Sequence, residues 1–411
     1  MTKNNKQYFF ILGINPELSI AEIVSLLKGR SIKFEVDLAI ESVLVISCSE
    51  IEDDFFNQLG GSKKFGIIDG QVDSLDSFDL ENMLDGKIKE DKFRFGFSLY
   101  NFSKNDLKRA HPKMRRVGLT YKKELKAKGV KSRLVESKEE ELSSVIVHKE
   151  KMIKHGADVV LIKYRDSIFY GQTLSVQDFN AFSARDYGKP GRDIASGMLP
   201  PKLARIMLNL VNVDENMVIL DPFCGSGTVI LEALSMGLKN IYGSDKSETA
   251  VDDTGRNLIW WQQHYVLDDM PEIIKCSVEV LSDNYDKDSI DVIITEPFLG
   301  PSLRGRETPA QIHSIQSQLL TLYKISLEQF AKVLKPDGKV AMIWPVFVDG
   351  RGEQVFLNLK DKVNELDLEI VNCLSNIEVS VEQPTKYRRT YFYCREGQRV
   401  CREVVVLQKK N

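Results

Sequence analysis

The chain has 411 residues, a formal net charge of −3, 43% hydrophobic residues and 28% charged residues. This is the composition of a globular protein with two or three domains, and such a net charge does not by itself indicate a nucleic-acid-binding protein. No apolar run approaches the roughly 18 residues of a membrane-spanning helix. The six cysteines lack a Cys-x-x-Cys motif, and the five histidines form no metal-binding motif. We therefore expect no metal site, no disulfide framework and a reducing, cytoplasmic location.

Residues 1–72 alternate between apolar stretches of strand character and of helix character. Their order predicts a ferredoxin-like βαββαβ domain. The expected elements are a strand at 8–14, a helix at 18–30, strands at 31–38 and 42–48, a short helix at 51–61 and a strand at 63–69.

Residues 73–176 form a second predicted α+β domain. Its expected elements are a strand at 91–101, a helix at 117–129, a strand at 130–137, a helix at 142–156 and a hairpin of strands at 158–164 and 167–176. The next segment, 177–197, is polar, contains three glycines and one proline, and shows no clear period. It is predicted to be a linker.

From residue 198 to residue 411 the pattern becomes that of an α/β domain. Short apolar strands alternate with helical stretches, which predicts a parallel sheet covered on both faces. The expected strands lie at 217–220, 240–244, 277–281, 291–295 and 339–344. The final stretch, 388–409, predicts a terminal hairpin around a Glu-Gly turn.

The stretch LDPFCGSGT, residues 220–228, follows a predicted strand and opens a helix. Gly225 and Gly227 allow the backbone to turn tightly and to approach a ligand. Asp221 and Asp245 end neighbouring strands, where an acid binds ribose hydroxyls in many α/β proteins. No lysine follows the second glycine, which excludes a P-loop. The alternatives are a plain tight turn for the glycines and a helix N-cap for Asp245.

This stretch resembles motif I of class I S-adenosylmethionine-dependent methyltransferases, above all of those that methylate amines. The resemblance implies a Rossmann-like domain in which the glycine turn, with Asp221 and Phe223, faces the methionine part of the cofactor. It also implies that Asp245 holds the ribose. An acid after the third strand meets the adenine amine in this family, and Asp283 is the candidate, with a solvated loop carboxylate as the alternative.

A longer stretch, residues 170–210, resembles the junction between the THUMP and catalytic domains of archaeal and eukaryotic tRNA guanosine-10 N2-methyltransferases. Residues 73–176 then correspond to a THUMP-like RNA-binding domain, and tRNA is the implied partner. The eukaryotic relatives use a small activator subunit, for which this sequence carries no signal, nor does it indicate an oligomeric state. Met198, Leu199 and Pro200 are expected beside the cofactor, or else in the domain core.

The stretch TEPFLGP, residues 295–301, occupies the position of the catalytic motif in this resemblance. The family usually has Asp or Asn, two prolines and an aromatic residue. Here Glu296, Pro297 and Phe298 stand in their place. A side-chain acceptor and a proline carbonyl can bind both N–H groups of a base amine, and an aromatic ring can stack on the base. Three functions remain open: guanine N2 methylation, methylation of another RNA or DNA base amine, and RNA binding by a catalytically inactive relative.

The stretch from Lys108 to Arg133 contains eleven Lys or Arg residues and one Glu. Such a run neutralises phosphates, and the alternative is a solvated helix face. Together with the THUMP resemblance it predicts tRNA contacts at Arg109, Lys113, Arg115, Arg116, Lys122 and Lys123.

Overall fold

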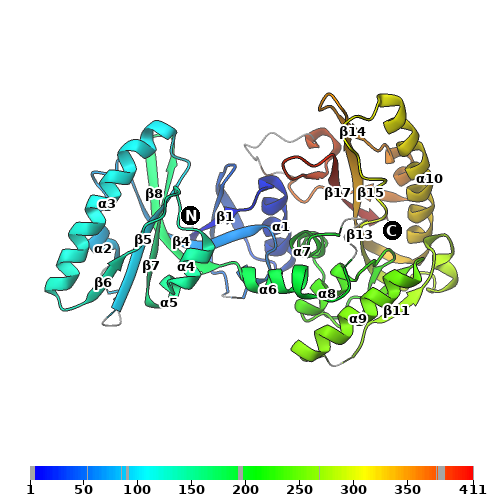
Figure 1. Ribbon diagram of the computed structural model, residues 1–411, viewed down its shortest axis with the longest axis horizontal. Helices are drawn as coiled ribbons and strands as arrows, with labels where there is room; N and C mark the ends of the chain where they lie inside the picture. Colours follow the sequence, from blue (N-terminus) through cyan, green and yellow to red (C-terminus); the bar gives the residue numbers. More distant parts are fainter. Residues whose placement is uncertain are drawn as a thin grey trace. The chain divides into compact units, whose positions relative to one another are not determined.

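The computed structural model describes residues 5–52, 54–84, 86–88, 92–192, 198–267, 269–375, 377 and 385–410 (Figure 1). It divides into two compact units. The first unit comprises Met1–Pro16, Ile32–Asn57 and Ser62–Phe179, and the second comprises Glu17–Ser31, Gln58–Gly61 and Asn180–Asn411. The three domain boundaries expected from the sequence stay predictions.

The first unit is built on one mixed sheet of eight described strands, in the order β2-β3-β1-β4-β8-β7-β5-β6. The strands are β1 (Lys6–Leu12), β2 (Phe34–Ala39), β3 (Val43–Cys48), β4 (Ser62–Val72), β5 (Lys92–Tyr100), β6 (Lys131–Leu134), β7 (Gly156–Tyr164) and β8 (Ser167–Val176). The antiparallel pairing of β4 with β8 joins the strands of the two predicted N-terminal domains into this one sheet. The predicted hairpin is confirmed as β7 and β8.

The helices of this region differ in length from the predictions. They are η1 (Phe56–Gln58), α2 (Leu80–Leu84), α3 (Lys104–Ala127), α4 (Ser144–Lys149) and α5 (Met152–His155). The helix expected at 51–61 is only the short turn η1. The helix expected at 142–156 is interrupted because Lys151 has a left-handed φ of 52°. The helix expected from residue 117 begins at 104, where the Ser103 side chain accepts a hydrogen bond from the Asp106 N–H and caps it.

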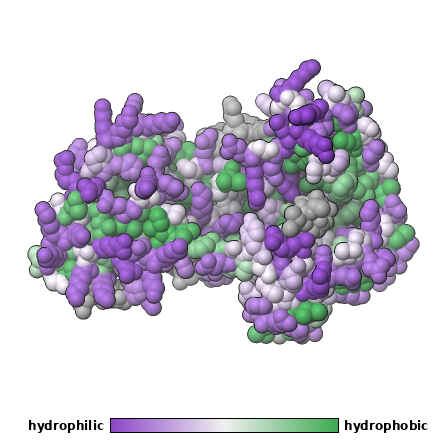
Figure 2. Space-filling view, viewed as in Figure 1, coloured by the Kyte–Doolittle hydropathy of each residue, from purple (hydrophilic) through white to green (hydrophobic). Residues whose placement is uncertain are grey.

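Helix α3 has one buried face and one basic face. Leu107, Met114, Tyr121 and Leu125 recur at helical spacing and pack into the core against β5 and β7. The Lys and Arg side chains occupy the other face, so hydrophilic groups gather over α3 in the space-filling view (Figure 2). Within the described residues, no helix is long and apolar enough to cross a membrane.

The second unit contains a nine-stranded sheet with the path β11-β10-β9-β12-β13-β17-β15. Its strands are β9 (Ile219–Asp221), β10 (Ile241–Asp245), β11 (Glu272–Lys275), β12 (Ile290–Thr295), β13 (Leu334–Val348), β14 (Gln354–Phe356), β15 (Leu368–Ile370), β16 (Tyr391–Tyr393) and β17 (Val400–Lys409). The neighbouring strands β11, β10, β9, β12 and β13 are parallel, as predicted. Strands β16 and β17 form the predicted hairpin. Strand order reverses between β9 and β12, which is where ligands bind in open α/β sheets.

The helices of the second unit are α1 (Pro16–Gly29), α6 (Phe179–Ser183), the π-helical turn η2 (Ala184–Gly188), α7 (Pro201–Leu210), α8 (Thr228–Ser235), α9 (Glu248–His264), η3 (Val278–Asp283), α10 (Pro309–Val333), α11 (Lys360–Glu365) and η4 (Lys386–Arg388). Helix α1 was predicted as part of the first domain, but it groups with the second unit. The predicted linker at 177–197 is thus helical over 179–188. Its residues 193–197 lie outside the described residues.

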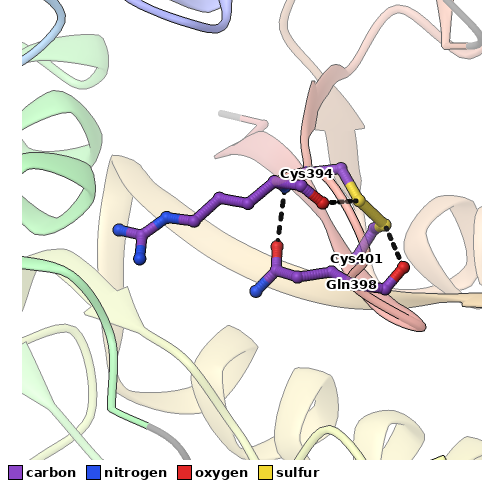
Figure 3. Close-up of a disulfide and its surroundings, with 4 residues drawn as sticks. Cys394, Gln398 and Cys401 are labelled. Atoms are coloured by element: carbon purple, nitrogen blue, oxygen red, sulfur yellow. Dashed lines mark hydrogen bonds between the residues drawn. A yellow bond between two sulfur atoms is a disulfide. The ribbon is translucent and has the colours of Figure 1, made fainter.

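Two sequence predictions for the second unit are wrong. The third strand is β11, and residues 278–281 of the stretch predicted as a strand at 277–281 belong to the 3-10 helix η3, which Ser277 caps. The expectation of no disulfide also fails, because Cys394 and Cys401 are bonded across the turn between β16 and β17 (Figure 3). The hairpin brings their Cα atoms to 4.9 Å, which a scan for Cys-x-x-Cys does not reveal.

Candidate functional site

The glycine-rich turn connects β9, which ends at Asp221, to α8, which begins at Thr228. Gly225 and Gly227 have φ values of +52° and +78°, in the left-handed region that favours glycine. A Cβ at Gly225 would have only a carbonyl oxygen near it, at 4.0 Å. A Cβ at Gly227 would meet Thr254 of α9 at 2.9 Å. Gly225 therefore faces open space, whereas Gly227 allows α8 and α9 to pack closely.

A cavity of about 590 Å³ lies at the carboxyl ends of β9, β10 and β12. Most of the residues predicted to bind the cofactor or the base line it, namely Asp221, Phe223, Gly225, Asp245, Glu296, Pro297 and Phe298. Met198 and Leu199 also line it, while Pro200 is the N-cap residue of α7. Gly227 and Asp283 are not among the lining residues.

Asp245 is held by the backbone at the end of β10. Its Oδ2 accepts a hydrogen bond from the Gly225 N–H at 3.1 Å, and its Oδ1 accepts one from the Ser247 N–H at 2.9 Å. Each carboxylate oxygen has further acceptor capacity. The carboxylate is therefore fixed at the cavity wall and can accept hydrogen bonds from a pair of ligand hydroxyls.

Asp221 lies at the base of the same wall and is only 2% exposed. Its Oδ1 accepts hydrogen bonds from the Thr295 hydroxyl at 2.8 Å and from the Phe223 N–H at 3.1 Å. Burial raises the pKa of Asp221 to about 7, although these hydrogen bonds act in the opposite direction. The negative charges of Asp245 and Glu296 raise the pKa further. A carboxyl group at this position is poised to ionise near neutral pH.

Asp283, the acid predicted to follow the third strand, does not directly follow it. Because β11 ends at Lys275, the residues that follow the strand are 276–279, and Ser277, Val278 and Glu279 line the cavity. Asp283 ends η3 and is exposed. Of these two acids, Glu279 lines the cavity and Asp283 does not, because the third strand ends earlier than the sequence pattern predicts.

The acid of the TEPF stretch has a partner that sequence analysis missed. Arg402 of β17 donates from Nε to the Glu296 Oε1 at 2.5 Å and from Nη2 to Oε2 at 3.3 Å. The two side chains are only 8% and 10% exposed. Burial acts to lower the pKa of Arg402, but the charge and hydrogen bonds of Glu296 outweigh it and the pKa is raised. The only signal in the sequence is the charged pair Arg402-Glu403 inside an apolar strand.

Phe298 has the exposure expected of a stacking surface. Its side chain is 55% exposed and lines the cavity. The hydroxyl of the buried Tyr323 on α10 donates to the Phe298 carbonyl at 3.3 Å, which holds the backbone of this loop. The Glu296–Phe298 stretch is therefore anchored from two elements, β17 and α10.

Sequence analysis also missed the residues behind the glycine turn. Lys189 is buried, and its Nζ donates to the Thr228 hydroxyl at 2.7 Å. Burial lowers the pKa of Lys189 to about 8. Asn257 of α9 donates to the carbonyls of Gly191 and Ser226, which ties the segment before α7 to the turn. Within the described residues, no group of three or more His, Cys, Asp or Glu side chains is placed to hold a metal ion.

The residues predicted to bind RNA lie together on α3. Five of the six are exposed and Lys113 is half-buried. Lys113 pairs with Asp76, and Arg115 pairs with Glu136 at 2.9 Å. The other four, Arg109, Arg116, Lys122 and Lys123, form no ion pair in the part of the chain that the structure describes.

Strand order, glycine turn and cavity together define the second unit as a Rossmann-like domain of the class I methyltransferase type. Residues 191–346 match the family model of the RMKL-like methyltransferase domain. A second model, described as DNA methylase, matches residues 86–256.

Similar proteins point in the same direction. The chain is 32% identical over 176 residues to the tRNA (guanine(10)-N2)-dimethyltransferase of Methanothermobacter thermautotrophicus, covering 43% of this chain and 46% of the relative. The enzyme of the same name from Methanocaldococcus jannaschii is 27% identical over 195 residues, covering 46% of this chain and 49% of the relative. The match thus spans about half the length of these curated relatives. The resemblance to this methyltransferase family drawn from the sequence is confirmed.

Solved structures share the fold over nearly the whole chain. TrmN from Thermus thermophilus aligns with a TM-score of 0.54 at 16% identity, over 98% of this chain and 99% of that one. A possible methylase from Clostridium difficile 630 aligns with a TM-score of 0.51 at 14% identity, over 99% and 98%.

Proposed function

We propose that the chain transfers a methyl group from S-adenosylmethionine to the exocyclic N2 amine of a guanine in tRNA. One observation carries the proposal: a single cavity is lined by the glycine turn, by Asp245 and by the Glu296–Phe298 loop. The curated relatives named as tRNA guanine N2 methyltransferases support the choice of substrate. A cytoplasmic location is part of the proposal.

The cavity suits S-adenosylmethionine. Its volume of about 590 Å³ is in the usual range for small-molecule sites. Gly225 leaves room for a ligand close to the backbone, and the Asp245 carboxylate would accept hydrogen bonds from the ribose hydroxyls. Glu279 takes the place of Asp283 as the candidate for the adenine amine. When bound, S-adenosylmethionine supplies the methyl group on a positively charged sulfur.

The Glu296–Phe298 loop would hold the base. A base amine is a weak nucleophile because its lone pair is delocalised into the ring, so orientation is the main contribution that the protein can make. Glu296 and the Pro297 carbonyl would accept the N–H groups, and the exposed ring of Phe298 would stack on the base. The guanine must leave its helical stack, at a cost of a few kcal/mol. Docking of tRNA on the basic face of α3 would offset this cost.

The test is transfer from isotopically labelled S-adenosylmethionine to unmodified tRNA transcripts, followed by nucleoside mass spectrometry. We expect label in N2-methylguanosine, and none after Glu296→Ala. Label in another nucleoside, or in an oligodeoxynucleotide offered in place of tRNA, would favour another base amine; this second arm is included because of the DNA methylase match. Binding of tRNA without binding of S-adenosylmethionine by calorimetry would favour an inactive RNA-binding relative.

A further inference from the structure

Lys189 is a buried cation that lies behind the glycine turn. Its side chain donates from Nζ to the Thr228 hydroxyl at 2.7 Å and to the Ser226 hydroxyl at 3.4 Å. The residue is only 2% exposed. Within the part of the chain that the structure describes, its partners are these two hydroxyls and not a carboxylate. Buried charges in proteins are normally paired, so the charge of this ammonium calls for an explanation.

The acids around Lys189 do not supply the missing partner. Burial lowers the pKa of Lys189 to about 8, and the charges of Asp186, Glu232 and Asp253 act in the opposite direction. Glu232 and Asp253 are paired with arginine side chains of their own, and Asp253 also lines the cavity. None of the three forms an ion pair with Lys189 among the described residues. The ammonium is therefore mainly charged at neutral pH and is balanced only from a distance.

The Ser226 and Thr228 hydroxyls connect this charge to the cavity. Both residues line the cavity, whereas Lys189 does not. A hydroxyl that accepts a hydrogen bond still has its own O–H to donate. Among the described residues, the Thr228 O–H has no protein acceptor, and the Ser226 O–H reaches only the weak acceptor Met198 Sδ, at 3.7 Å. Two O–H donors are therefore available to a ligand at one place in the cavity wall.

This end of the cavity suits an anionic group. An ammonium that donates to a hydroxyl polarises it and strengthens the hydrogen bond that the hydroxyl donates in turn. Thr228 begins α8, and the N-terminus of a helix carries partial positive charge. Arg192, from the same segment as Lys189, also lines the cavity. An ammonium group at this place would be repelled, whereas a carboxylate would be bound.

We propose that Lys189 is a positioning residue that makes the Ser226 and Thr228 hydroxyls bind the carboxylate of the methionine part of S-adenosylmethionine. This inference rests on the proposed function. S-adenosylmethionine carries a carboxylate and an ammonium on the same carbon atom. Lys189 attracts the first and repels the second, so it decides which of the two faces the hydroxyls. The contact orients the cofactor and takes no part in the transfer of the methyl group.

The experiment measures by calorimetry the binding of two thioethers, S-adenosylhomocysteine and its decarboxylated form, S-adenosyl-3-thiopropylamine. The two differ only in the carboxylate. We expect the wild-type protein to bind S-adenosylhomocysteine about 10-fold or more tightly. Lys189→Met should weaken this binding by about 10- to 100-fold, which is the usual effect of losing a hydrogen-bonded charge. It should not weaken binding of the decarboxylated form, because that ligand has only the repelled ammonium. Lys189→Arg should retain more of the preference.

Two further variants separate this role from a purely structural one. Thr228→Val keeps the shape of the side chain but removes the hydroxyl, so it should also reduce the preference for the carboxylate. It decides the question if Lys189→Met does not fold. Thr254→Val is the control, because the Thr254 hydroxyl holds the turn by donating to the Gly225 carbonyl at 2.8 Å and carries no charge. This variant should weaken binding of both ligands alike.

The inference is overturned if the wild-type protein binds both ligands equally well, or if Lys189→Met keeps the full preference. It is also overturned if Lys189→Met weakens both ligands to the same degree, as Thr254→Val should. In each of these cases the wild-type protein still binds S-adenosylhomocysteine and the proposed function stands. Absence of any binding of S-adenosylhomocysteine by the wild-type protein overturns both.

Discussion

At the scale of single residues, sequence analysis located most of the residues that line the cavity but not the partners of their side chains. The glycine turn, Asp245 and Glu296 were predicted because each lies at or directly after the end of a strand, and strand ends at a switch point meet ligands. Arg402 and Lys189 were not, because each comes from a segment far away in the chain and only the fold brings it close. Asp283 does not line the cavity, because the third strand ends earlier than predicted.

Asp221 should make the stability of the folded protein depend on pH. Its pKa in the folded protein is about 7, raised from 3.8 by burial. The protonated form is therefore favoured by folding. This contribution to stability is complete below the unfolded pKa and is lost as pH rises through about 7. At pH 8 the wild-type protein should therefore have lost on the order of 4 kcal/mol of its free energy of unfolding. Asp221→Asn should remove this pH-dependent loss.

Urea unfolding at pH 4.5 and pH 8 tests this prediction. The variant should be clearly more stable than the wild-type protein at pH 8, and the difference should shrink at pH 4.5. A difference that stays the same at both pH values would contradict the assignment.

Gly225 should be required for ligand binding rather than for folding. Gly225→Ala places a Cβ in the cavity and imposes a left-handed conformation on alanine, at a cost of roughly 1 kcal/mol. Gly237→Ala imposes the same conformation, with φ +80°, where a Cβ meets nothing within 4 Å. Thermal stability should fall similarly in both variants. Calorimetry should show loss of S-adenosylmethionine binding for Gly225→Ala alone; equal loss in both would show that Gly225 has only a backbone role.

At the scale of elements, periodicity located most strands and helices but failed where tertiary contacts decide. The stretch at 277–281 alternates like a strand, yet it is a 3-10 helix packed against α10, where Gln329 accepts from the Ser282 N–H. The strand itself, Glu272–Lys275, is only four residues long and half-exposed, so it has little apolar signature. The basic first half of α3, which includes Pro112, hid its helical period in the same way.

The sheet of the first unit contains a buried charge network that no sequence pattern revealed. Lys64 of β4 donates to Asp158 of β7 at 2.7 Å, and Ser98 of β5 and Thr173 of β8 donate to the same carboxylate. Lys64 and Asp158 are 1% and 0% exposed. The network therefore joins four strands of the sheet.

Removal of one partner of this pair should be strongly destabilising. Lys64→Met leaves Asp158 charged and buried without its cation, at a cost of about 3 to 5 kcal/mol. Replacing both partners, by Lys64→Met and Asp158→Leu, should recover much of the loss. The exposed pair Lys6–Glu50 at the edge of β1 is the control, and Lys6→Ala should leave the denaturation midpoint nearly unchanged. Equal effects of Lys64→Met and Lys6→Ala would contradict this account.

At the scale of the whole molecule, the second unit matches its prediction as an α/β methyltransferase domain, and the N-terminal part differs in organisation. The strands of the ferredoxin-like and THUMP-like predictions share one sheet, while α1 groups with the second unit. There Glu22 accepts hydrogen bonds from the backbone N–H groups of Gly60 and Gly61 and from Asn209 of α7. Burial raises the pKa of Glu22 to about 7. Local patterning cannot reveal such a long-range assignment.

The basic face of α3 should contribute to RNA affinity without taking part in the chemistry. Arg115→Glu combined with Arg116→Glu should weaken tRNA binding and make its dependence on salt shallower, because fewer counterions are released. Lys275→Glu, at a similarly exposed residue of the second unit, is the control. Gel shifts across a salt series measure both quantities. An unchanged slope for the double variant would exclude this face as a phosphate contact.

The most direct measurement is nucleoside mass spectrometry of tRNA from cells that lack the chain, complemented with either the wild-type protein or Glu296→Ala. If the cavity brings a guanine amine to a methyl donor, N2-methylated guanosine should be depleted in these cells, restored by the wild-type protein and not restored by the variant. Unchanged N2-methylated guanosine in the absence of the chain, or full restoration by Glu296→Ala, would contradict that role.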